Sequence, residues 1–258
     1  MCACAVSVSP LPSNFGPMWV LWRKETFALL YSLTAYLVWG IFLVGTGLFV
    51  WVFSGGVVQT GAAELDAFFS VAPWFLLFLA PALTMRSFAE EFRTGSYELL
   101  ATAPLSRWEI VLGKYLAVAT VLAFALVPTG VFYLSIAWLA QPRWAVDHGA
   151  IQGAYIGLFG LGLALAALGI WASASTAHTI IAFLLGLFWG FVMLIGLEFA
   201  SELPLGRSLQ ELLAQLSLME HYRSVSRGVV DLRDVVYFLS VIVGGLGLAH
   251  FQLSRRHP

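Results

Sequence analysis

Three polar residues near position 175 have side-chain types that could support catalysis. Ser173 and Ser175 offer hydroxyl nucleophiles and His178 offers a base, the pairing that an intramembrane hydrolase would need. Their spacings to His178, five and three residues, place all three on one short turn, and neither an orienting carboxylate nor an oxyanion donor accompanies them. We therefore predict that the chain is not an enzyme.

Two further segments could in principle hold a nucleotide or a metal ion. Gly113 and Lys114 lack the preceding glycine of a phosphate-binding loop, and Tyr115 stands where such a loop has Ser or Thr. Cys2 and Cys4 are the only cysteines, so neither a disulfide nor a cysteine-rich metal site can hold the body of the chain together. The sequence predicts no cofactor, and any energy from ATP must come from another chain.

The composition indicates where the remaining residues must lie. The chain has 258 residues, of which 60% are hydrophobic and only 10% charged, whereas soluble domains average about 25% charged residues. This composition predicts an integral membrane protein in contact with membrane lipids. It excludes a soluble enzyme, a disordered chain and a disulfide-built secreted module. The formal net charge of −1 lacks the basic surplus of a nucleic-acid-binding protein.

Six apolar runs are each long enough to cross a bilayer, which takes roughly 20 residues per helix. The runs are continuous and lack the alternating pattern of barrel strands. They predict an all-α integral membrane protein with six transmembrane helices at about 27–53, 66–85, 114–140, 150–174, 178–197 and 235–253. Only the short segment 174–177 separates the fourth span from the fifth.

The positions of lysine and arginine predict the orientation, because basic residues favour cytoplasmic loops. Eight of the thirteen lie before span one, around the loop between spans two and three, or after span six. Since the number of spans is even, both termini are then cytoplasmic. The eight are Arg23, Lys24, Arg86, Arg93, Arg107, Lys114, Arg255 and Arg256.

Charged residues are scarce within the predicted spans. Glu198 and His250 fall near helix ends, where an interface would hydrate them, and Asp231 and Asp234 fall at the start of span six, where the helix dipole favours anions. A carrier coupled to an ion gradient usually holds its ion or proton on buried carboxylates near the midplane. The lack of buried Asp, Glu and Lys argues against that class.

Short helices are predicted before the first and the last span. Trp19 and Trp22, beside two basic residues, indicate a surface helix with an aromatic anchor ahead of span one. Ser208 and Glu211 form an S-x-x-E capping box before span six, and leucines follow it at helical spacing. We expect that helix to lie at the outer interface or to dip back toward the bundle.

Pairs of small residues recur at the four-residue spacing that lets helices approach closely in a membrane. We attribute them to packing within one bundle and infer no oligomer from them. The pairs are Gly153 with Gly157, Gly186 with Gly190, and Gly245 with Ala249.

The polar loop 85–117 is the most informative segment. Gly95 followed by Glu98 indicates the start of a short helix within it. This helix can extend only to about Ala103, because Pro104 cannot continue it.

A capping box formed by Ser106 and Glu109 follows and begins the helix that leads into span three. The short helix thus lies between two long ones, with apolar residues along it and the charged residues Glu90, Glu91 and Arg93 ahead of it. A docking element for a cytosolic partner would have this form. A solvated loop with a helix cap is the alternative.

Three segments resemble a known family: LLYSLTAYLVWGIFLVGTGLFVW from Leu29, FFSVAPWFLLFLAPALTMRSFAEEFRTGSYELLATAPLSRWEIVLGKYLA from Phe68, and LMEHYRSVSRGVVDLRDVVYFLS from Leu218. They resemble the permease subunits of ABC-2 type transporters, and most closely the gliding-motility F-type permease. The resemblance covers about 18–253. It predicts one ABC-2 type transmembrane domain at 18–258. Met18 reads like a natural start, so residues 1–17 are predicted to be a poorly ordered leader, or the product of an upstream start codon.

The resemblance implies a fold and a mechanism. The fold has six spans, an N-terminal elbow helix, a cytoplasmic coupling helix and re-entrant helices before the last span. In such transporters a separate cytosolic ATP-binding cassette ATPase docks on the coupling helix, and closure of the ATPase dimer switches the permease between inward-facing and outward-facing states. The chain would then be half of an exporter permease in the bacterial cytoplasmic membrane. It would need two ATPase copies and a second permease chain, identical or homologous.

By resemblance, seven residues of the coupling region would contact the ATPase rather than catalyse a reaction: Glu90, Glu91, Arg93, Gly95, Glu98, Leu100 and Pro104. A non-transporting membrane scaffold or anchor that recruits a cytosolic partner is the alternative function. Spans rich in Gly, Ala, Leu, Phe and Trp favour a lipidic, polymeric or amphiphilic cargo over a small ion.

Overall fold

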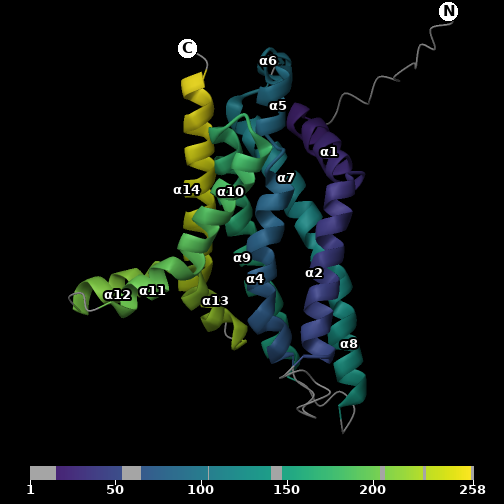
Figure 1. Ribbon diagram of the computed structural model, residues 1–258, viewed down its shortest axis with the longest axis vertical. Helices are drawn as coiled ribbons and strands as arrows, with labels where there is room; N and C mark the ends of the chain where they lie inside the picture. Colours follow the sequence, from purple (N-terminus) through teal and green to yellow (C-terminus); the bar gives the residue numbers. More distant parts are fainter. Residues whose placement is uncertain are drawn as a thin grey trace, which may run out of the picture.

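The computed structural model describes residues 16–53, 65–103, 105–140, 147–203, 207–228 and 231–256. In these ranges the regular elements are all helices, and they form one elongated bundle (Figure 1). The prediction of an all-α integral membrane protein is confirmed. Of the predicted leader at 1–17, only Gly16 and Pro17 fall within the described residues, and Pro17 begins the first helix.

Six helical segments of the described chain are long and apolar enough to cross a bilayer, as predicted. They are Leu33–Trp51, Asp66–Thr94, Arg107–Leu139, His148–Ser175, Thr179–Glu202 and Leu232–Arg255. The long helices within them are α2 (Leu33–Trp51), α4 (Asp66–Thr84), α7 (Arg107–Leu126) continued by α8 (Gly130–Leu139), α9 (His148–Ser175), α10 (Thr179–Phe191) and α14 (Leu232–Arg256). The shorter helices are α1 (Pro17–Leu30), α5 (Ala89–Thr94), α6 (Ser96–Ala101), α11 (Leu197–Glu202), α12 (Arg207–Gln215) and α13 (Leu218–Ser226).

Helix α9 is the centre of the bundle, because α4, α7, α10, α13 and α14 all pack against it. Its sequence is rich in Gly and Ala, so it presents little side chain where its neighbours approach. Helices α2, α10 and α14 lie at the periphery and expose broad apolar faces.

The predicted small-residue pairs pack within the bundle. A Cβ on Gly153 would meet the backbone of Gly228, and a Cβ on Gly245 would lie 3.0 Å from the backbone carbon of Ala167. Gly228 itself has a φ of +86°, a left-handed conformation that favours glycine, in the turn that follows α13. These contacts hold α13 and α14 close to α9.

Span one begins at Leu33, not near residue 27 as predicted. Ser32 has an extended backbone, with φ −78° and ψ 127°, which interrupts the helix and separates α1 from α2. Residues 27–30 therefore belong to α1, which packs against α7 as an elbow helix (Figure 1). Hydropathy alone could not reveal this break, since the sequence is apolar on both sides of it.

Spans three and five are both interrupted. Pro128 lacks an N–H donor, and α7 passes through a 3₁₀ turn at Val127–Thr129 before α8 begins. In span five a π-helical turn at Val192–Gly196 separates α10 from α11. Helices α11 and α12 then leave the bundle sideways (Figure 1). Together with α13, they are the interfacial or re-entrant helices predicted before the last span.

Helix α12 begins one residue before its predicted cap. Because the helix starts at Arg207, Ser208 lies within it and not at its N-cap. The side-chain amide of Gln210 donates a hydrogen bond to the carbonyl of Leu203, 2.7 Å away, which links α12 to the end of α11. Leu209 and Leu212 of α12 are exposed, and so is Leu216 directly after it, as expected for a helix at an interface.

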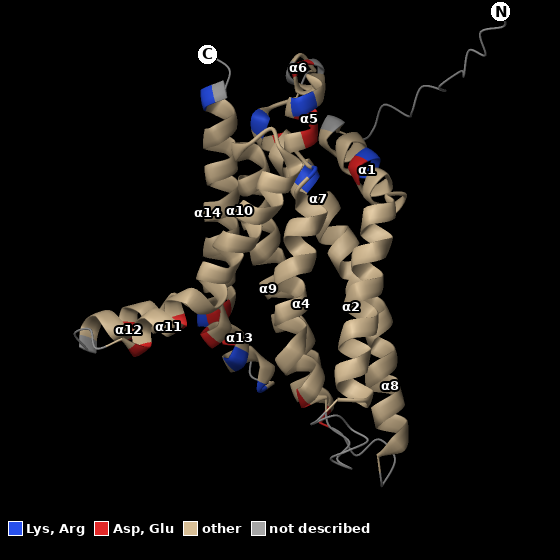
Figure 2. Cartoon of the chain, viewed as in Figure 1, with Lys and Arg blue, Asp and Glu red and all other residues tan. Residues whose placement is uncertain are grey.

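Most of the charged residues lie in two zones, and the helices between them are almost free of charge (Figure 2). One zone surrounds α5, α6, part of α1 and the end of α14, and the other surrounds α11, α12 and α13. The start of α1 and the end of α14 lie at the same end of the bundle (Figure 1). The side of the membrane on which the two termini lie stays a prediction.

The packing of α14 on α9 makes a testable prediction. The substitution Gly245→Val should lower the free energy of unfolding by about 1–3 kcal/mol, because the added atoms meet backbone that cannot move aside. Gly244→Val is the matched control on the same helix, since a Cβ there would have no atom within 4 Å. Thermal unfolding in detergent measures both variants, and equal losses would contradict this packing.

Candidate functional site

The polar loop folds into two short helices, α5 and α6, at one end of the bundle (Figure 1). We call residues 89–101 the α5–α6 unit. Gly95 ends α5 and begins α6 with a φ of +73°, a conformation that L side chains rarely adopt. The predicted helix start near Gly95 and end ahead of Pro104 are confirmed. Pro104 itself lies outside the described residues.

An aromatic cluster attaches the α5–α6 unit to the bundle. The Tyr97 ring is 4% exposed and packs edge-on against Phe92 and Phe88, with ring centroids 5.0 and 6.5 Å apart. Phe88 is completely buried. Leu100 is partly buried and packs against the same core. The unit therefore has an apolar inner face and a polar outer one.

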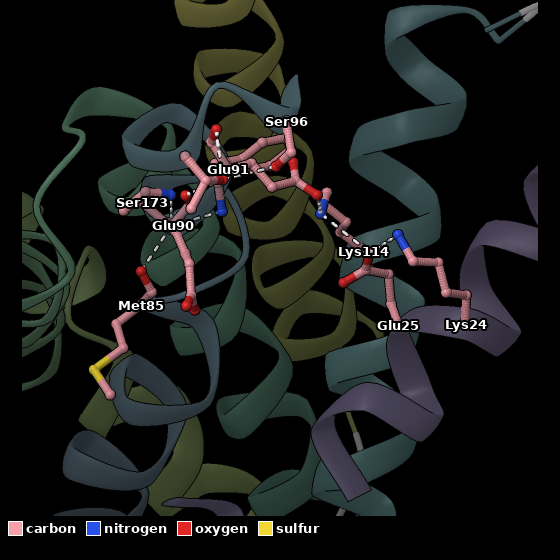
Figure 3. A network of polar contacts seen from close by, with 11 residues as sticks. Lys24, Glu25, Met85, Glu90, Glu91, Ser96, Lys114 and Ser173 are labelled. Atoms are coloured by element: carbon pink, nitrogen blue, oxygen red, sulfur yellow. Dashed lines mark hydrogen bonds and ion pairs between the residues drawn. The ribbon is translucent and has the colours of Figure 1, made fainter. Parts of the chain in front are cut away.

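The start of α5 is capped by a side chain from another helix. The Ser173 hydroxyl, near the end of α9, accepts hydrogen bonds from the backbone N–H groups of Phe88 (3.0 Å) and Ala89 (3.2 Å). It donates its own proton to the carbonyl of Met85, 3.1 Å away (Figure 3). Helix starts leave N–H groups without intrahelical partners, and a buried start needs such a cap. The central helix thus holds the α5–α6 unit directly.

A buried lysine makes the second attachment. Lys114, on α7, is 1% exposed, and its Nζ lies 2.7 Å from Glu91 Oε1 on α5 and 3.4 Å from Glu25 Oε1 on α1 (Figure 3). Lys24 lies 3.8 Å from the same Glu25 oxygen. We call Lys24, Glu25, Glu91 and Lys114 the lysine cluster. It joins the elbow helix, the α5–α6 unit and span three at one point.

The charges of this cluster depend on one another. Moving a single ammonium out of water costs several kcal/mol unless anions compensate it. Lys114 has two carboxylates, and the exposed Lys24 balances the excess negative charge. The ammonium also lies 5.2 Å from the centre of the Phe88 ring, within cation–π range. Glu91 Oε2 is buried without a hydrogen-bond partner, so Glu91 depends on Lys114 in turn.

The outer face of the α5–α6 unit carries charges that face solvent. Glu90 lies 3.9 Å from Arg86 and 3.7 Å from Arg93, in pairs that are largely exposed. Glu98 is exposed on α6. Surface pairs of this kind contribute little to stability, so these residues are available for contacts with another molecule.

The seven predicted coupling residues therefore fall into three groups. Arg93, Gly95 and Glu98 are exposed and Glu90 is partly so, all on the outer face. Glu91 and Leu100 face the bundle, Glu91 toward Lys114 and Leu100 toward the apolar core. Pro104 has no described position.

Sequence reasoning missed the residues that hold this unit in place. From the sequence, Lys114 was assigned to the loop and Ser173 was considered as a nucleophile, whereas no role was predicted for Glu25. One signal could have found Lys114: apolar residues lie three and four positions away on both sides, which places it on a buried helix face. They are Ile110, Val111, Ala117 and Val118.

The expectation that the chain lacks buried Asp, Glu and Lys is wrong for Lys114, and it is also wrong for a carboxylate at the start of α14. Asp234, at the start of α14, is buried, and its Oδ1 lies 2.7 Å from His221 Nδ1 on α13. The other ring nitrogen, Nε2, lies 2.9 Å from the carbonyl of Gln215, and the ring stacks on Tyr237. A long-range partner, not the helix dipole alone, thus holds Asp234.

The two serines considered for hydrolysis both bond to the backbone. Ser173 donates its proton to a backbone carbonyl, and Ser175 donates to the carbonyl of Trp171. His178 is exposed. Within the described ranges, no three His, Cys, Asp or Glu side chains are grouped as a metal site would require.

Comparison with known proteins identifies the family. Residues 54–209, more than half of the chain, match the family described as ABC-2 family transporter protein. The chain therefore belongs to this family, whose members are membrane components of ABC transporters, are not themselves catalytic, and work with an ATP-binding cassette partner. A search of curated proteins found no significant match.

The lysine cluster makes a prediction about stability. Lys114→Met should lower the free energy of unfolding by about 3 kcal/mol, because it leaves the inward-facing Glu91 without its cation. The double variant Lys114→Met with Glu91→Leu should lose less than the single one, since the uncompensated charge is gone. Lys24→Met, at a lysine that is 71% exposed, is the control and should change little. A Lys114→Met loss no larger than that of the control would disprove the arrangement.

Proposed function

We propose that this chain is the transmembrane permease subunit of an ATP-binding cassette exporter, and that the ATPase docks on the α5–α6 unit. The observation that carries the proposal is the attachment of this unit to three helices through the lysine cluster and the Ser173 cap. A docking element must transmit force, and one fixed at several points moves with the spans to which it is fixed. The family match supports the general class, since an ABC-2 component works with an ATPase.

The proposed contact surface is the outer face of the unit. Glu90, Arg93 and Glu98 would contact the ATPase directly, and Gly95 sets the angle between the two helices. Leu100 and Glu91 would act from the inner face, by anchoring the unit to the core and to Lys114. The proposed role of Pro104 is to prevent α6 from extending further, because proline cannot continue a helix.

The proposed orientation places this surface in the cytoplasm. Basic residues of α1, α5, α7 and the end of α14 lie in the charged zone around the unit (Figure 2), and such residues favour the cytoplasmic side of a bacterial inner membrane. Both termini would then be cytoplasmic. The complete transporter would contain two ATPase copies and a second permease chain, identical or homologous. The broad apolar faces of α2 and α10 provide surface for that chain.

The cargo class follows from the apolar character of the spans. Helices α2 and α10 present aliphatic and aromatic side chains, which would suit a lipidic, polymeric or amphiphilic substrate. The closer resemblance to the gliding-motility permease stays a sequence-based expectation, because the family match is common to ABC-2 transporters in general.

Docking is tested by reversing charges on the outer face. The variant Arg93→Glu with Glu98→Arg should reduce ATPase binding by at least about tenfold, because several like-charge contacts would replace favourable ones. It should leave thermal stability unchanged, since both side chains are exposed. Glu220→Arg, an exposed site on α13, is the control. Co-purification of the partner ATPase, followed by hydrolysis in proteoliposomes, measures the effect.

Two results would overturn the proposal in different ways. Normal binding and coupled hydrolysis in the double variant would remove the docking site from the α5–α6 unit. Binding of the ATPase to the unaltered chain without any substrate-stimulated hydrolysis would favour the alternative, a membrane scaffold that recruits a partner and transports nothing.

A further inference from the structure

A small pocket opens where span five bends out of the bundle. Its volume is about 180 Å³, and α4, α13 and the π-helical turn with α11 surround it. Pockets that enclose a drug-sized molecule usually measure about 300–1,000 Å³. This one therefore fits a headgroup or a comparable fragment, with the rest of a larger ligand remaining outside.

The pocket carries charges of both signs. Glu198 Oε1 and Arg223 Nη1 are 2.5 Å apart and form one wall. Arg223 is 53% exposed, and a guanidinium has five N–H donors, so this pair leaves donors for a second anion. Glu202 adds an exposed carboxylate. The lining, with two carboxylates and one guanidinium, has a formal charge of −1.

Aromatic and apolar side chains complete the lining. Trp74 on α4 and Phe199 on α11 are 43% and 63% exposed, so their ring faces are accessible to a ligand. Such rings attract ammonium groups through cation–π interaction. Ile195 and Met219 form the buried floor.

The position of the pocket suggests where its ligand comes from. Most of its lining residues belong to α11 and α13, and these helices lie in the charged zone at the limit of the uncharged part of the bundle (Figure 2). Lipid headgroups lie at this level of a membrane, and Trp is enriched there. The apolar residues Leu203 and Phe191, both exposed on the same segment of the chain, offer surface for acyl chains.

We propose that this pocket binds the headgroup of a zwitterionic phospholipid. The phosphate would accept hydrogen bonds from the free N–H groups of Arg223, and the ammonium would lie by Glu202, between the rings of Trp74 and Phe199. The negative lining disfavours an anionic lipid such as phosphatidylglycerol, whose headgroup has no ammonium. This site is independent of the ATPase-docking proposal, because it lies in the other charged zone and needs no partner chain.

Competition between two lipids tests the site. The purified full chain in detergent is incubated with equal amounts of phosphatidylethanolamine and phosphatidylglycerol of identical acyl chains, and native mass spectrometry measures the lipid that stays bound. We expect several-fold more phosphatidylethanolamine. The variants Glu202→Gln and Trp74→Leu should each reduce this preference by about two- to fivefold. Arg227→Gln, an exposed site that does not line the pocket, should leave it unchanged.

A second arm separates the headgroup from the chains. Water-soluble glycerophosphoethanolamine in excess, which has the zwitterionic phosphodiester of the lipid, should displace the bound lipid if the pocket recognises the headgroup. Equal retention of the two lipids, unaltered preference in both variants, or no displacement by glycerophosphoethanolamine would each overturn the proposal. Because Glu202 and Trp74 are both exposed, neither substitution removes a buried contact on which folding depends.

Discussion

A lysine ammonium enclosed by protein must keep its anions close, and the arrangement of one end of this molecule follows from that requirement. Lys114 can be buried only if Glu91 and Glu25 approach it, and these residues lie on α5 and α1. The elbow helix, the polar loop and span three are therefore fixed relative to one another. Exposed ion pairs could not do this, since their strength is comparable to thermal energy in water.

The second attachment connects this end to the centre of the bundle. Ser173 belongs to α9, against which four of the other long helices pack, and its hydroxyl holds the start of α5. A force applied to the α5–α6 unit would thus be transmitted to α7 and α1 through the lysine cluster. It would be transmitted to α9 through the hydrogen bonds of Ser173. Gly95 and the aromatic cluster keep the unit itself compact. This connectivity is what a membrane component driven by an external ATPase requires.

Local signals in the sequence predicted most of the fold. Apolar run length located six spans, Pro104 limited the short helix, and the Ser106–Glu109 capping box is present as expected. The break at Ser32 was missed because no change in polarity accompanies it. The orientation of the side chains in the polar loop could not be predicted, because which of them face inward depends on partners far away in sequence. Ser173 is 85 residues from Phe88, and no local pattern encodes that distance.

The most direct test of the central claim measures whether the lysine cluster holds α5–α6 to α1. Cys2 and Cys4 are first replaced by Ser, and spin labels are attached at Ser96→Cys on α6 and Arg23→Cys on α1, both exposed positions. Pulsed electron paramagnetic resonance then measures the distance between the two labels. The structure predicts one narrow distance distribution, which broadens when Lys114→Met is added. An equally narrow distribution in both proteins would show that the cluster does not fix the unit, and would contradict the account.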